Sequence, residues 1–67
     1  MTTPQLTEAQ QHALMVIEHG GWTPDTTTMH YALGEGKDGR GCVMVLCRGQ
    51  QGSEITFGIE VDGYAHT

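Results

Sequence analysis

Basic residues are scarce in this chain of 67 residues, which has three Lys and Arg side chains against eight Asp and Glu. The formal net charge is −5 at neutral pH. A protein that binds duplex nucleic acid directly needs clustered Lys and Arg to displace counterions from the phosphates. The bases here, Lys37, Arg40 and Arg48, are too few to form such a cluster. We therefore expect no direct binding of nucleic acid.

Cysteine is sparse as well, because Cys42 and Cys47 are the only two. They lie at an odd spacing in one extended apolar stretch, so in a strand their side chains point to opposite faces and cannot bridge each other. Free thiols are typical of a reducing compartment. The N-terminal segment also lacks the basic and apolar regions of a signal peptide. These features predict a cytoplasmic protein.

Long apolar runs are missing, and none approaches the roughly 20 residues needed to cross a bilayer. We therefore expect no membrane association. With 67 residues, of which 37% are hydrophobic, the chain is expected to form one small domain over residues 1–67 with a thin core. Such a core leaves little room for a walled active site, so we expect no enzymatic activity.

The first organised segment is predicted to be a helix over residues 8–19. Thr7 and Gln10 have the spacing of a capping box, in which the hydroxyl and the amide satisfy each other's backbone donors. Good helix formers follow, and Gly20 provides a stop signal. Apolar residues recur along one face only, so the helix is expected to lie on another layer.

The remainder is predicted to form three strands near residues 28–33, 42–48 and 53–61, after a connector over 20–27. The middle segment is apolar on both faces, which indicates a central strand, and the last alternates cleanly. The predicted fold class is α+β, with one N-terminal helix packed on a three-stranded antiparallel β-meander (α-β-β-β).

The register of the last hairpin follows from its loop. A three-residue loop over 50–52 places Gly52 at a left-handed position, which such loops favour. Residues whose numbers sum to 102 then face each other, for example Val45 and Phe57 on the apolar face. A slip of one residue would bury acidic side chains and expose Phe57, so the turn and the apolar pattern agree.

One helix can cover only one face of this sheet. Apolar side chains would remain on the other face, and an open apolar row on a small domain usually marks an interface. The alternative is that the N-terminal segment or the loop around Trp22 folds over it. We predict that the partner-binding residues are His30, Cys42, Met44, Leu46, Thr56 and Glu60.

Catalytic and metal-binding patterns are weak. His12 and His19 share a helix face but lie about 10 Å apart along its axis, too far for one zinc ion to bind both directly. Neither cysteine belongs to a CxxC pair, so we expect no metal and no cofactor. Cys42 with His30 is the only nucleophile and base combination, and it has no oxyanion hole beside it.

The sequence thus favours a small, acidic, non-enzymatic module that binds a larger protein and modulates or inhibits it. One setting that suits its size and charge is a phage-type inhibitor of a host nucleic-acid-processing or defence complex. The alternative is a homodimer that pairs through the open sheet face. The acidic surface would either mimic nucleic acid toward such a partner or only keep the protein soluble.

Overall fold

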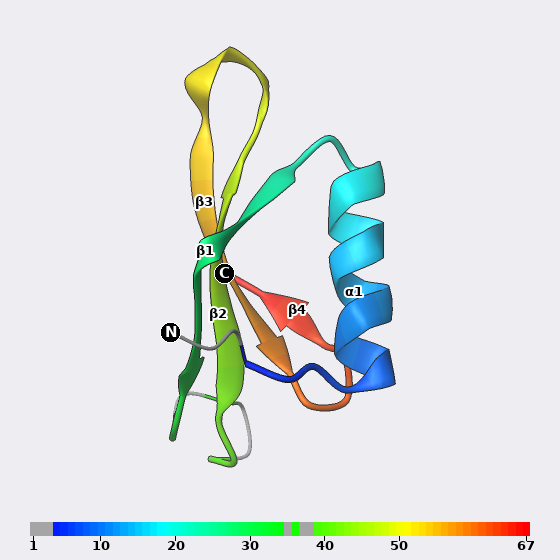
Figure 1. Cartoon of the computed structure of the whole chain (residues 1–67), viewed down its shortest axis with the longest axis vertical. Helices are drawn as coiled ribbons and strands as arrows, with labels where there is room; N and C mark the ends of the chain where they lie inside the picture. Colours follow the sequence, from blue (N-terminus) through cyan, green and yellow to red (C-terminus); the bar gives the residue numbers. More distant parts are fainter. Residues whose placement is uncertain (1–3, 35, 37–38) are drawn as a thin grey trace.

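The computed structural model describes residues 4–34, 36 and 39–67. Within them, one helix lies against a four-stranded antiparallel sheet in the order β1-β2-β3-β4 (Figure 1). The predicted α+β class is confirmed, although the sheet has one more strand than expected. The elements are α1 (Glu8–His19), β1 (Thr23–Ala32), β2 (Cys42–Arg48), the 3-10 helix η1 (Gln50–Gly52), β3 (Glu54–Glu60) and β4 (Ala65–His66).

Helix α1 has the predicted bounds, and its capping box also ties the helix to the sheet. The backbone N–H of Gln10 donates to Thr7 Oγ1 at 3.1 Å, and the backbone N–H of Thr7 donates to Gln10 Oε1 at 2.9 Å. Gln10 is only 1% exposed, and its Nε2 donates to the carbonyl of Ile59 in β3 at 3.0 Å. The Thr7 hydroxyl donates to the carbonyl of Val61 at 2.9 Å.

The hydrophobic core lies between α1 and the sheet. Trp22 closes one end of it by packing edge-on against Phe57, with ring centroids 6.1 Å apart. Burial, with a smaller contribution from the nearby carboxylate of Glu18, raises the pKa of the Cys47 thiol. The buried core side chains are Ala13, Ile17, Met29, Val43, Val45, Cys47 and Ile59.

The predicted β2–β3 register is confirmed along the whole ladder, from Cys42 opposite Glu60 to Arg48 opposite Glu54. The loop over 50–52 also has Gly52 in the left-handed region, at φ 79°. Strand β3 spans Glu54–Glu60 rather than 53–61, because a turn begins directly after Glu60 and the Gly63 N–H donates to its carbonyl at 2.8 Å.

Strand β1 begins at residue 23, five residues before the predicted start at 28, so the expected connector over 20–27 is wrong in its second half. Pro24 is accommodated because β1 is an edge strand, where a missing N–H is tolerated. The register shifts between Asp25 and His30. In this bulge the Thr28 hydroxyl accepts from the backbone N–H of Leu46 at 2.9 Å, replacing a ladder bond.

Strand β4 was not predicted. It pairs with β3 through two residues, with His66 opposite Gly58 and Ala65 opposite Ile59. The sequence signal that could have revealed it is the Asp-Gly pair at 62–63, which is a common hairpin turn. Gly63 has φ 93°, and a side chain there would lie 2.9 Å from the Ala9 carbonyl of α1.

Candidate functional site

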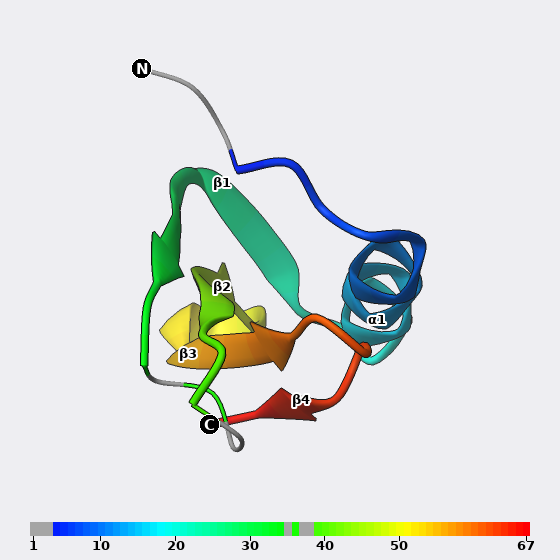
Figure 2. The ribbon, with the colours of Figure 1, turned by 90° about the horizontal axis from the view of Figure 1, so that it is seen from below.

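Helix α1 lies on one side of the sheet (Figure 2). Side chains alternate along each strand, so those between the core residues point to the side of the sheet away from α1. We call this side the outer face. No helix of the described residues covers it. The outer face carries His30, Cys42, Met44, Leu46, Arg48, Thr56, Glu60 and His66.

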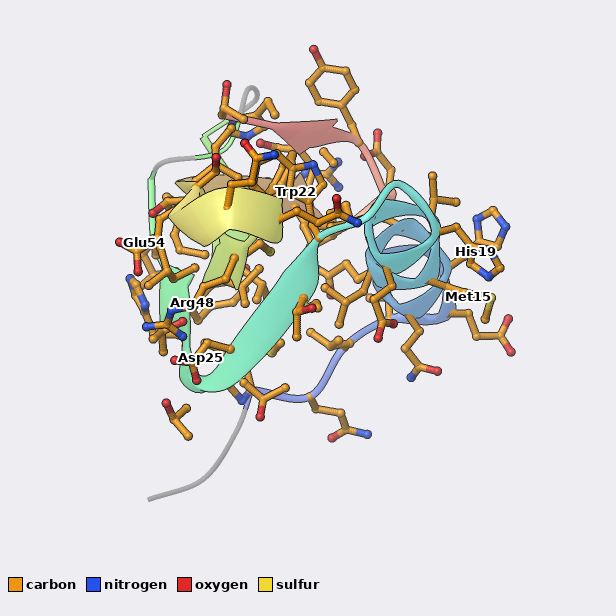
Figure 3. The ribbon with its side chains drawn as sticks, turned by 90° about the horizontal axis from the view of Figure 1, so that it is seen from above. Met15, His19, Trp22, Asp25, Arg48 and Glu54 are labelled. Atoms are coloured by element: carbon orange, nitrogen blue, oxygen red, sulfur yellow. The ribbon has the colours of Figure 1, made fainter. Side chains whose placement is uncertain are left out.

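At one end of the outer face, Arg48 lies between Asp25 and Glu54 and forms an ion pair with each of them (Figure 3). Arg48 Nη1 is 2.8 Å from Asp25 Oδ2, and its Nε is 3.1 Å from Glu54 Oε2. A hydrogen bond from the Thr27 hydroxyl and another from Arg48 hold the pKa of Asp25 below its usual value. Because the Arg48 and Glu54 side chains are half exposed, this network adds little stability.

The middle of the outer face contains both apolar and polar side chains. Met44 and Leu46 are half-buried, while His30 and Thr56 are exposed. The Nδ1 of His30 lies 3.0 Å from the backbone carbonyl of Thr28. This region presents apolar surface with polar groups at its margin.

The other end holds three side chains of metal-ligating types, two of them buried and the third, His66, partly exposed. Cys42 is 0% exposed and Glu60 is 2% exposed. His66 Nε2 lies 2.7 Å from Glu60 Oε2. The ligand atoms of Cys42, Glu60 and His66 all lie within 4.8 Å of one another, and Cys42 Sγ is also 3.5 Å from Met44 Sδ. We refer to Cys42, Glu60 and His66 as the ligand cluster.

Two glycines shape the space around the ligand cluster. A Cβ on Gly58 would lie 2.8 Å from the His66 ring and 3.2 Å from Met44 Sδ, so only glycine leaves room for both side chains. A Cβ on Gly36 would lie 2.5 Å from Glu60 Oε1, so the backbone between β1 and β2 approaches this carboxyl group closely. The Tyr64 ring stacks on His66 with centroids 5.8 Å apart.

The six predicted partner-binding residues lie on one face, but two of them are buried within the chain. Cys42 and Glu60 therefore offer almost no surface to a partner. His66 was absent from the sequence interpretation, which paired Cys42 with His30. The structure groups the Cys42 thiol with His66 instead.

A second feature is an open hollow of about 350 Å³ beside Trp22. Among the described residues, those that line it carry no ionisable side chain. The lining residues are Gly20, Gly21, Trp22, Gly49, Gln50 and Ser53.

No helix of the described residues has the length and apolar character needed to cross a membrane. Comparison of the chain with protein-family models, with curated proteins and with solved structures finds no match.

Proposed function

We propose that this protein is a non-enzymatic binding module whose outer face docks onto a larger protein and modulates or inhibits it. The observation that carries the proposal is the absence of a second helical layer over this face among the described residues, with Met44 and Leu46 at its centre. Apolar side chains that are grouped on an open face usually mark an interface. Methionine suits such a surface because its side chain adapts to different partners.

Met44 and Leu46 are half-buried, and the more exposed apolar side chains, among them Leu33 and two residues of α1, lie elsewhere. Met15 and Val16 are 52% and 56% exposed on α1. They are consecutive in α1, so their side chains point to different sides of the helix and do not form one patch. Single exposed apolar residues are ordinary on soluble proteins. Met44 and Leu46 instead lie two residues apart on one strand, so both point outward from the same face.

The net charge of the chain indicates which charge the partner carries. Eight acidic residues against three basic ones give the protein a negative field. Electrostatic complementarity then favours a partner that surrounds its apolar patch with basic residues. We propose a protein of this chemistry as the occupant of the outer face.

The test uses quantitative affinity capture from cell lysate with the wild type and two charge variants. Thr56→Arg adds a bulky cation at an exposed position of the outer face, where it should not disturb folding. Met15→Asp is the matched control on α1. We expect a specific partner that Thr56→Arg loses and Met15→Asp retains, with affinity for the purified partner reduced by about 10-fold or more. Equal capture by both variants would refute docking at the outer face.

The mass of the purified protein in solution distinguishes the homodimer alternative from docking onto a larger protein. A dimer of twice 7.3 kDa that dissociates in Thr56→Arg would assign the outer face to a second copy of the chain. A monomer over the same concentration range would leave that face available to a foreign protein.

A further inference from the structure

We propose that Cys42, Glu60 and His66 bind one zinc ion, which clamps β4 to the rest of the sheet. The three side chains come from three adjacent strands, β2, β3 and β4. Their ligand atoms already lie within 4.8 Å of one another. This proposal does not depend on the docking of a protein at the outer face.

The ladders of the sheet bring the three ligands together. Cys42 is directly opposite Glu60 in the β2–β3 ladder, and His66 is opposite Gly58 in the β3–β4 ladder. All three side chains point to the outer face because the facing positions alternate along each strand. The stacking of Tyr64 on His66 further restricts the orientation of the imidazole. The donors are therefore held by regular structure.

The distances suit a zinc ion after small side-chain adjustments. Zinc binds sulfur at about 2.3 Å and nitrogen or oxygen at about 2.0–2.2 Å, so ligand atoms in a tetrahedral site lie roughly 3.3–3.8 Å apart. His66 Nε2 and Glu60 Oε2, now 2.7 Å apart, would separate by about 0.6 Å. Because Gly58 has no side chain, the His66 ring lies directly over the β3 backbone beside Met44, within reach of the other two ligands.

The donor chemistry favours zinc over the common alternatives. Magnesium and calcium prefer sites made only of oxygen, whereas thiolate and imidazole ligands are typical of zinc. A Cys42 thiolate and a Glu60 carboxylate together carry two negative charges, which balance a divalent ion in a buried position. A water molecule or the Met44 thioether, 3.5 Å from Cys42 Sγ, would complete the coordination. A thioether ligand is more typical of copper(I), which makes copper the competing metal.

Zinc binding would have a structural consequence for β4. This strand has only two residues and pairs with β3 at two positions. Three metal bonds would join β4 to β2 and β3 and would stabilise the folded state by mass action. We therefore expect the melting temperature to rise by about 10 °C or more when free zinc exceeds its Kd by 100-fold.

The experiment titrates the reduced 67-residue chain with zinc alone in competition with a chromophoric chelator, and with cobalt(II) as a spectroscopic probe. Cobalt bound to a thiolate gives a sulfur-to-metal charge-transfer band. We expect His66→Gln and Cys42→Ser to lose more affinity than the roughly 10–100-fold that an outer-shell partner costs. The matched controls are His30→Gln on the same face and Cys47→Ser in the core, and both should keep the band.

Each outcome decides the proposal. Zinc binding that depends on Cys42 and His66, with both controls unaffected, supports it. Absence of zinc binding by folded protein at micromolar concentrations would overturn it, as would binding that Cys42→Ser and His66→Gln leave unchanged. Copper(I) binding that displaces zinc and is weakened in Met44→Leu would overturn the assignment to zinc. Circular dichroism establishes that each variant is folded, and Glu60→Gln replaces Cys42→Ser if the latter is not.

Discussion

The Gln10 side chain provides the most specific test of how this small fold is held together. Its Oε1 accepts from the Thr7 backbone at the helix N-terminus, and its Nε2 donates to the Ile59 carbonyl in β3. The side chain is also 1% exposed, so water cannot replace these partners freely. Gln10→Leu has nearly the same volume and removes both hydrogen bonds.

The expected cost of Gln10→Leu is about 1 kcal/mol in the free energy of unfolding. Ile59 faces Val43 at a hydrogen-bonded position of the β2–β3 ladder, so its carbonyl keeps one partner and loses the other, and the loss of one such hydrogen bond costs about 0.5–1.5 kcal/mol. The Thr7 N–H contributes less because Thr7 is exposed and water can reach it. A 67-residue domain has a total stability of roughly 3–10 kcal/mol, so the loss is a large fraction of it. The melting temperature should fall by about 4–8 °C.

Urea unfolding followed by far-UV circular dichroism measures this loss, with Gln11→Leu as the matched control. Gln11 is exposed, and its substitution should change stability by less than about 0.5 kcal/mol. A second variant, Gln10→Glu, separates hydrogen bonding from packing. An ionised carboxylate would face the Ile59 carbonyl, whereas the protonated acid can donate to it, so the pKa in the folded state is raised. The stability of Gln10→Glu relative to wild type should therefore improve as the pH falls.

Two results would refute this reasoning. A Gln10→Leu variant as stable as Gln11→Leu would mean that the Ile59 carbonyl needs no partner from α1. A Gln10→Glu variant whose stability relative to wild type does not change with pH would mean that the carboxyl group never faces that carbonyl.

Two further predictions concern the opposite end of the sheet. The hydrogen bond from Thr27 helps to hold the pKa of Asp25 below 3.8 in the folded state, so its stabilising contribution is complete above pH 3.8 and is lost as the pH falls through the folded pKa. The stability difference between wild type and Asp25→Asn, measured by urea unfolding, should shrink over that range, and a constant difference would contradict it. Gly49→Ala would place a Cβ 2.9 Å from the Trp22 ring, so we expect a loss of about 1–3 kcal/mol and a shift in tryptophan emission, and unchanged emission and stability would contradict this contact.

The elements that could be predicted from the sequence are those whose determinants are local. The bounds of α1 follow from a capping box between Thr7 and Gln10 and from a glycine stop. The β2–β3 register follows from a three-residue loop and from alternation that tolerates no slip. In both cases a few neighbouring residues contain the information, so a sequence pattern is sufficient.

The elements that were missed depend on tertiary contacts. The first half of β1 forms because β2 offers an unpaired edge, and the Thr28 side chain bridges a bulge that no local pattern indicates. Strand β4 has two residues, too few for a periodic signal, and Gly63 must fit against Ala9 of α1 for its turn to form. Local propensity therefore predicted a connector where the first half of β1 lies, and it predicted no strand where β4 lies.

The same reason explains why the ligand cluster was not found by ligand spacing. Spacing rules detect sites whose ligands share one helix or one tight turn. Here each ligand occupies a different strand, and His66 belongs to the shortest of them. The correct pairing of Cys42 with Glu60 was predicted, but its significance depends on a third side chain that only the unexpected β4 supplies. A site whose ligands come from several strands can thus be predicted only when every one of those strands is predicted.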